Sequence, residues 1–206
     1  MKLLARLSPR TKFVLMFVLF AMPITASYLT FFFWQPKVTN NFGELIRPVI
    51  NLPQEKLTLV DGGDAPQHVI DKGLRGKWLM VTRDSGACDG ACANKLYTMR
   101  QARLVLNKDM DRVVRVVLID DEAAPATLLR QDFSGSAFVM AKDSQWLAKL
   151  PIEANDASGG RGYIYAVDPM GNLFMRYKAD EDIKQLAADF RRVLKASQLG
   201  KEFEDK

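Results

Sequence analysis

The residues with the clearest chemistry are the only two cysteines of the chain, Cys88 and Cys92. The apolar segment 78–81 predicts a strand just before them, and a helix is expected just after them. A thiol reacts as the thiolate, and the amino-terminal end of a helix lowers the pKa of a thiol. Two thiols four residues apart at a strand-to-helix junction therefore indicate a redox pair or a site for a soft metal. The alternative is a pair of inert buried cysteines, because free cysteine packs well as a small hydrophobic residue.

The spacing also bears on a disulfide between Cys88 and Cys92. A bond over so short a loop removes little unfolded-state entropy, far less than the roughly 3 kcal/mol expected for a fifteen-residue loop. Residues four apart on a regular helix have Cβ atoms about 5–6 Å apart, whereas a disulfide needs about 3.5–4.5 Å. Gly90 can relax the loop, so oxidation is feasible if Cys88 lies outside the helix. We expect Cys88 to be the accessible catalytic thiol and Cys92, at the helix start, its resolving partner, in a thiol–disulfide oxidoreductase reaction.

An uncharged apolar segment, residues 13–34, lies near the amino terminus. Its twenty-two residues can span a hydrocarbon core of about 30 Å. Four cations and no acidic residue precede it, at Lys2, Arg6, Arg10 and Lys12. Positive charge stays on the cytoplasmic side, so we expect a single-pass anchor in a bacterial inner membrane with the carboxyl-terminal domain in the periplasm. A signal peptide cleaved near residues 21–26 is the alternative.

The net charge of +5 comes largely from these four amino-terminal cations. The four cations before the apolar segment leave about +1 for the rest of the chain. The basic character therefore reflects topology and does not indicate nucleic-acid binding.

Composition and hydrophobic pattern divide the chain into five parts. We expect a cytoplasmic basic segment (1–12), a transmembrane anchor (13–34), a linker (35–56) rich in Pro and Asn, an α/β domain (57–198) and a short tail (199–206). Within the linker, residues 42–46 are expected to form a short helix.

The hydrophobic pattern of residues 57–198 alternates between strands and helices. Strands are expected at 57–60, 67–70, 77–83, 112–119, 137–140, 162–167 and 173–177, with residues 61–64 as a hairpin turn between the first two. Helices are expected from Cys92 to about residue 107, at 125–130, at 144–150 after an Asp143 cap, and after an Asp180 cap. The first of these helices places Lys95 among its polar residues. Segment 112–119 is almost entirely β-branched, as buried parallel strands are. This order predicts a thioredoxin-like α/β sandwich.

Several segments in this order resemble the Sco/SenC family, which are membrane-anchored thioredoxin-fold proteins that assist cytochrome c oxidase assembly. The segment Leu74-Arg75-Gly76-Lys77 is similar to the family's LRGK, and Cys88 to Cys92 keep its CxxxC spacing. Further similarity lies at 117–121, 165–171 and 187–191. The resemblance implies a copper or thiol role for Cys88 and Cys92 and a respiratory-oxidase subunit, or another thiol or copper protein, as partner.

Two positions depart from that family pattern. Asp89 replaces the proline that usually follows the first cysteine, and Gly160 stands where the copper-binding histidine is expected. Two thiolates suit Cu(I), but the family completes its copper site with an imidazole. The other candidate donors are His68, Met140, Met170 and Met175.

Charged residues near the cysteines would tune the thiols in opposite directions. The acids Asp84, Asp89, Asp120 and Asp121 would raise thiol pKa values, whereas Arg83 and Arg161 would lower them. Strand-end and turn roles are the alternative for the acids.

Three functional hypotheses follow. The first is a thiol–disulfide protein that assists assembly of the oxidase copper site. The second is a Cu(I) chaperone that uses Cys88 and Cys92. The third is a non-catalytic assembly scaffold.

Overall fold

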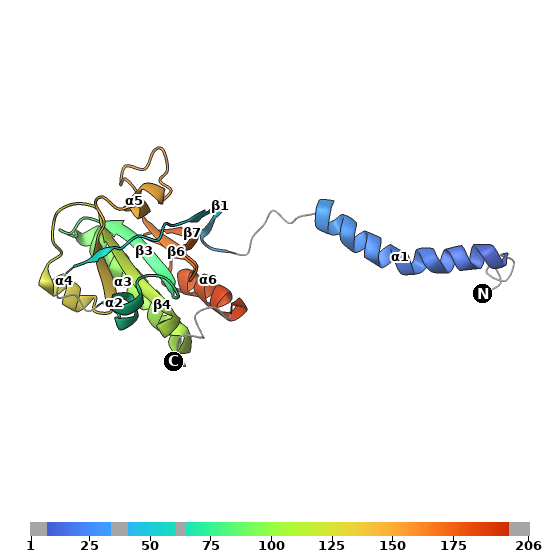
Figure 1. Ribbon diagram of the computed structural model, residues 1–206, viewed down its shortest axis with the longest axis horizontal. Helices are drawn as coiled ribbons and strands as arrows, with labels where there is room; N and C mark the ends of the chain where they lie inside the picture. The colour runs from blue at the N-terminus through green and yellow to red at the C-terminus, as the bar shows by residue number, and fades with distance from the viewer. Residues whose placement is uncertain (1–7, 34–40, 61–64, 198–206) are drawn as a thin grey trace. The chain divides into compact units, whose positions relative to one another are not determined.

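The computed structural model describes residues 8–33, 41–60 and 65–197 and separates the chain into two compact units, Met1–Asn40 and Asn41–Lys206 (Figure 1). In the first unit, α1 (Pro9–Phe33) contains Pro23 and has no buried residue. It is long and apolar enough to cross a membrane by length and composition. The structure therefore provides the helix expected of an anchor.

The second unit is built on a mixed sheet whose described strands run in the order β1-β7-β6-β3-β4-β5-β2. The central strands β3 (Trp78–Asp84), β4 (Val113–Ile119) and β5 (Ser136–Met140) are parallel to one another. All seven residues of β4 are buried, as its β-branched sequence predicts. The strand β6 (Tyr163–Val167) pairs antiparallel with β3 and with β7 (Asn172–Lys178).

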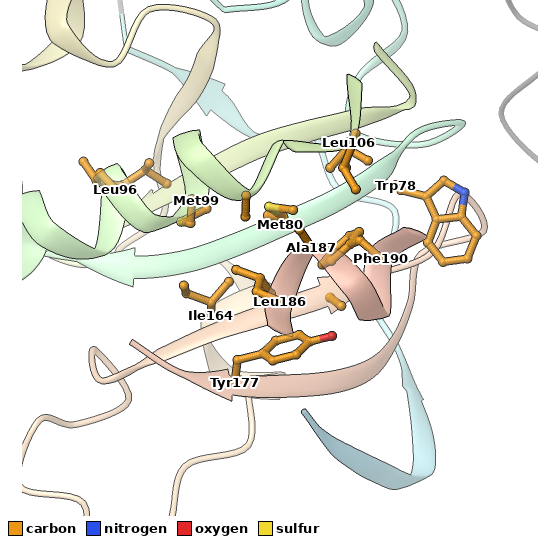
Figure 2. Close-up of a cluster of buried hydrophobic side chains, with 14 of the residues drawn as sticks. Trp78, Met80, Leu96, Met99, Leu106, Ile164, Tyr177, Leu186, Ala187 and Phe190 are labelled. Atoms are coloured by element: carbon orange, nitrogen blue, oxygen red, sulfur yellow. The ribbon is translucent and has the colours of Figure 1, made fainter. Parts of the chain in front are cut away.

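Helices cover both faces of this sheet. On one face, α3 (Gly90–Val105) and α6 (Ile183–Ala196) contribute Leu96, Met99, Leu186 and Phe190 to a buried cluster, which Figure 2 shows against β3 and β6. A second cluster on the other face includes Trp146 of α5 (Gln145–Lys149) and Val69 of α2 (Gln67–Lys72). A mixed sheet between two helical layers confirms the predicted thioredoxin-like fold.

Two predicted elements were wrong. Residues 42–46 were expected to be a helix in a linker, but β1 (Glu44–Asn51) is an edge strand that pairs antiparallel with β7. Residues 67–70 were expected to be a strand, but they begin α2. Only Thr58–Leu59 of the expected first strand is paired, as β2 with β5. The expected hairpin turn at 61–64 lies outside the described residues.

Two predicted helix caps lie one or two residues from the observed ones. The hydroxyl of Ser144, not Asp143, accepts the hydrogen bond from the Trp146 amide at the start of α5. The carboxylate of Asp182, not Asp180, accepts from the Lys184 and Gln185 amides at the start of α6. Two further helices are present among the described residues. The helix α4 (Thr127–Asp132) follows Pro125 as expected, and the short 3-10 helix η2 (Asn107–Arg112) precedes β4.

Candidate redox site

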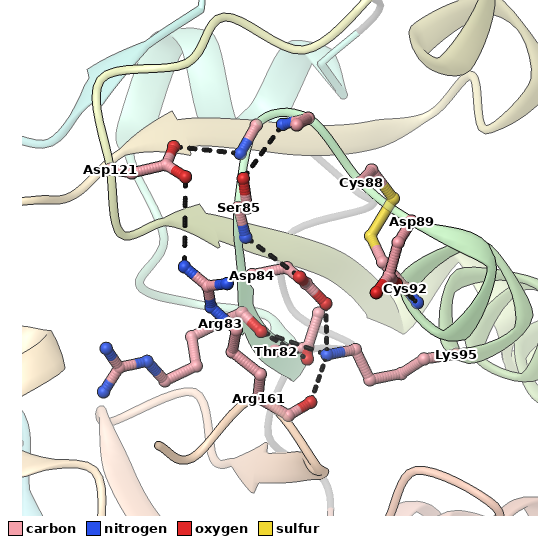
Figure 3. The surroundings of a disulfide bond; sticks show 12 residues. Thr82, Arg83, Asp84, Ser85, Cys88, Asp89, Cys92, Lys95, Asp121 and Arg161 are labelled. Carbon is pink, nitrogen blue, oxygen red and sulfur yellow. Dashed lines mark hydrogen bonds and ion pairs between the residues drawn. A yellow bond between two sulfur atoms is a disulfide. The ribbon is translucent and has the colours of Figure 1, made fainter. Parts of the chain in front are cut away.

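The loop that follows β3 positions both cysteines. The Cys88 amide donates to the carbonyl oxygen of Ser85 at 3.1 Å, which closes a turn directly after the strand. Cys88 has a left-handed backbone with φ of 41° and is half-buried, whereas Cys92 is only 2% exposed. The two are joined by a disulfide with a Cα–Cα distance of 5.2 Å (Figure 3). Because Cys88 precedes the helix, the short loop can close, and Cys88 is the more exposed residue of the two.

Asp89 begins the helix that carries Cys92. Its backbone is extended, and its Oδ1 accepts a hydrogen bond from the Cys92 amide at 2.9 Å. This is the standard N-cap arrangement, in which a short polar side chain satisfies one of the free amides of the first turn. The aspartate that replaces the expected proline therefore defines the helix start, and it places a carboxylate beside the disulfide.

Lys95 lies one helical turn after Cys92 and is 1% exposed. Its Nζ forms an ion pair with Asp84 Oδ2 at 2.6 Å and donates to the carbonyl oxygens of Arg83, at 3.0 Å, and of Arg161. Burial lowers the pKa of Lys95, and the hydrogen bond and charge of Asp84 oppose that change. All three protons of the ammonium thus have acceptors, as a buried charge requires.

Lys95 was expected among the solvent-facing polar residues of this helix, and that expectation was wrong. A signal was available, because residues three apart on a helix share a face and Lys95 stands three residues after Cys92. Asp84, at the end of the adjacent strand, is the acid that this helical face meets.

Asp120 follows β4 and binds both arginines that were expected near the thiols. Its Oδ2 accepts from Arg83 Nε at 3.1 Å and from Arg161 Nε at 3.0 Å, and its Oδ1 lies 2.6 Å from an Arg161 terminal nitrogen. Burial alone would raise the pKa of Asp120, but the two guanidinium groups hold it below its usual value. Both arginines are therefore paired with Asp120, and their two positive charges are only partly balanced by its single negative charge.

Asp121 connects the cysteine loop to the segment after β4. Its Oδ1 accepts from the amides of Gly86 at 3.0 Å and Ala123 at 3.1 Å. A hydrogen bond from the Ser85 side chain, together with these amides, lowers the pKa of Asp121. At Gly86 an added Cβ would lie 1.6 Å from the Ala123 carbonyl oxygen, so the two segments approach too closely for a side chain. The cysteine loop is therefore held in place by the segment that follows β4.

The position of the expected copper-binding histidine does not suit a large side chain. Gly160 is buried with φ of 89°, and a Cβ there would meet Ile152 Cγ1 at 3.0 Å and Arg83 Cδ at 3.1 Å. The left-handed backbone and these contacts favour glycine. Within the described ranges, no group of three or more His, Cys, Asp or Glu side chains could hold a metal.

The three candidate methionines do not complete a copper site with the cysteines. Val167 pairs with Leu79, so the turn with Met170 lies at the opposite end of β3 from the cysteine loop. Met175 is 3% exposed in the core. Met140 ends β5, two strands from β3. His68 lies in α2, which leads into the amino-terminal end of β3. The described residues therefore bring together two sulfur atoms and do not fit the three-ligand copper site that the resemblance implies.

A cysteine pair between a central strand and a helix, with helical layers on both faces, defines a thioredoxin-like protein. The chain belongs to the family described as transmembrane-like, thioredoxin-like, C-terminal domain, whose model matches residues 78–197. No curated protein matches the sequence significantly.

Solved structures of Sco proteins are among the matches, as the sequence resemblance predicted. The apo Sco1 protein of Thermus thermophilus is 13% identical, with a TM-score of 0.53 over 76% of this chain and 99% of that one. BsSco, described as having a disulfide switch and as a member of the Sco family of cytochrome c oxidase assembly proteins, is 14% identical, with a TM-score of 0.52 over 75% and 100%. Yeast Sco1 with copper bound is 16% identical, with a TM-score of 0.50 over 61% and 83%. At these identities the likeness supports the fold.

Proposed function

We propose that this chain is a membrane-anchored thiol–disulfide exchange protein that assists assembly of the copper site of cytochrome c oxidase. The observation that carries the proposal is the unequal burial of the two bonded sulfur-bearing residues, Cys88 half-buried in the loop and Cys92 buried at the helix start. Access influences which sulfur takes part first in thiol–disulfide exchange, so the more exposed Cys88 is assigned the first step and Cys92 the resolving step. The oxidase as the client comes from the Sco resemblance alone.

The exchange step can be written from these positions. In the reduced protein, the Cys88 thiolate attacks one sulfur of a client disulfide, and the other client sulfur leaves as a thiolate that takes up a proton. The Cys92 thiol then loses its proton and attacks the Cys88 sulfur, which releases the second client thiol. Two electrons pass from the protein dithiol to the client disulfide, and the reverse sequence would oxidise a client dithiol.

The geometry also accounts for why this pairing serves chemistry better than stability. The disulfide closes a loop of only a few residues, and the loop is already held by hydrogen bonds to Ser85, Asp89 and Asp121. Constraining so short a loop contributes little unfolded-state entropy. Reduction should therefore leave the fold intact, as a working redox pair needs.

Serine variants test the assignment of the two thiols. With a small client disulfide, Cys92→Ser should accumulate a mixed disulfide through Cys88, because the resolving thiol is missing. Cys88→Ser should lose exchange and leave Cys92 slow to alkylate. If both thiols of the reduced native protein resist alkylation and the double serine variant supports normal oxidase assembly, the scaffold hypothesis replaces this one.

A Cu(I) chaperone is the second candidate, favoured by the juxtaposition of the two cysteine sulfurs and by the copper-bound yeast Sco1 among the matched structures. Competition against a Cu(I) chelator measures this with the reduced protein. Weak binding is expected, since two thiolates without a third ligand leave the metal open to competing thiols. Tight binding that His68→Ala or Met170→Ala abolishes would favour the chaperone.

A further inference from the structure

A buried ion pair lies beside the disulfide and is not explained by exchange itself. Lys95 and Asp84 have side chains only 2% and 9% exposed, and their charged atoms are 2.6 Å apart. The pair connects the helix that carries Cys92 to the end of the strand that leads to Cys88, as Figure 3 shows. The inference drawn from it rests on the proposed thiol–disulfide function.

The pair is costly to maintain, so a purely structural role is a weak explanation. Taking two charges out of water is expensive, and apolar side chains of similar size often replace buried ion pairs without loss of stability. Lys95 stands in a helical face that otherwise carries apolar core residues, with Cys92, Leu96 and Met99 as its neighbours. A charged residue therefore occupies a position whose helical neighbours are apolar.

The other charges around the loop are committed to separate partners. Arg83 and Arg161 are both bound by Asp120, and Asp121 is held by amides and lies 3.9 Å from Arg161. Asp89 caps the helix through the Cys92 amide and is exposed. Among the described residues, Lys95 is therefore the fully buried cation on the helix of the cysteine pair, and Asp84 is the carboxylate paired with it.

We propose that Lys95 and Asp84 are positioning residues that set the redox equilibrium of the cysteine pair, with Lys95 favouring the reduced thiolate form and Asp84 balancing that charge. The reason is Coulombic. A thiolate forms only in the reduced state, so a nearby positive charge stabilises that state and a nearby negative charge destabilises it. Lys95 lies one helical turn after Cys92, and Asp84 ends the strand that leads to Cys88. At an effective dielectric constant of about 20, a unit charge that close changes an equilibrium constant by on the order of tenfold.

Three variants of the full-length protein in detergent test the sign of this effect. At pH 8, each is equilibrated with a glutathione buffer, and the oxidised fraction is read from the alkylation mass shift. Asp84→Asn removes the negative charge while the carbonyl oxygens of Arg83 and Arg161 still accept from the Lys95 ammonium. The exchange equilibrium should therefore move up to about tenfold toward the dithiol, which corresponds to a potential about 30 mV less negative. Lys95→Met should move it by a similar factor toward the disulfide. The double variant should return close to the native value.

A matched control is Lys77→Met. Lys77 is a buried lysine, 8% exposed, that directly precedes β3 at the end away from the cysteines. This variant should leave the equilibrium unchanged. Opposite shifts that cancel in the double variant indicate a charge effect, because a loosened structure would not produce them. Shifts of the two single variants in the same direction, or no shift in either, would overturn the charge role. If Lys95→Met does not fold, the direction of the Asp84→Asn shift decides alone. Failure of the native protein to equilibrate with glutathione would instead refute the proposed function.

Discussion

At the scale of single residues, the cysteine loop depends on one close backbone approach. Gly86→Ala should destabilise the protein by at least about 1–3 kcal/mol, since its Cβ would lie 1.6 Å from the Ala123 carbonyl oxygen and the backbone must move. Urea unfolding measures this free energy. Gly90→Ala, at the first position of α3 just after this loop, is the control, because nothing lies within 4 Å of a Cβ there. Equal losses in the two variants would show that the Gly86 contact is relieved at little cost.

The Asp120 carboxylate makes stability depend on pH in a defined direction. Its native pKa is held below the usual value, so its contribution is fully present above the unfolded pKa of about 4 and is lost as pH falls through the native value. Asp120→Asn should cost about 1–3 kcal/mol at pH 7, less than for a fully buried pair because Arg161 reaches solvent. The difference between native and variant unfolding free energies should shrink below about pH 4. A constant difference down to pH 2 would contradict this.

Residue types and spacing predicted the cysteine site better than its surroundings. The position of Cys88 and Cys92 between a strand and a helix follows from local sequence, since apolar periodicity and turn residues are local signals. The burial of Lys95 does not, because it depends on Asp84 and on the Arg161 carbonyl, which tertiary contacts bring to it. The same holds for Gly160, whose fit depends on Arg83 and Ile152.

At the scale of elements, the last helix tests which aspartate is its cap. Asp182→Ala should lower the free energy of unfolding by about 1 kcal/mol, since its carboxylate accepts from two free amides of the first turn. Asp180→Ala, two residues earlier and exposed, should change it by less than about 0.5 kcal/mol. Thermal or urea unfolding of both variants decides the matter. A larger loss in Asp180→Ala would restore the cap predicted from the sequence.

The elements that were predicted correctly are those with a strong hydrophobic pattern in their own sequence. β4 is continuous and β-branched, and α6 keeps an apolar stripe with Leu186, Phe190 and Leu194 on one face. β1 was missed because its strand state comes from pairing with β7, more than a hundred residues away. The Phe42 and Gly43 amides just before it donate to the buried Asp189 of α6, another contact that no local pattern reveals.

At the scale of the whole molecule, we propose that the thioredoxin-like domain faces away from the cytoplasm. A reporter active only outside the cytoplasm should be active when fused after Lys206, since the positive charges lie before the apolar helix. The protein should also leave the membrane only with detergent. Activity of a cytoplasm-dependent reporter would reverse the orientation, and a soluble form that begins near Ala26 or Ser27 would identify a cleaved signal peptide.

The central claim is that Cys88 and Cys92 form a disulfide that opens and closes while the domain stays folded. The most direct measurement is alkylation of the full-length protein after equilibration in glutathione buffers of graded potential, followed by intact-mass analysis. We predict a single reversible two-electron transition, with both thiols modified together in the reduced protein and unfolding behaviour nearly unchanged. A protein that never takes up two alkyl groups without denaturant, or that unfolds on reduction, would contradict the account.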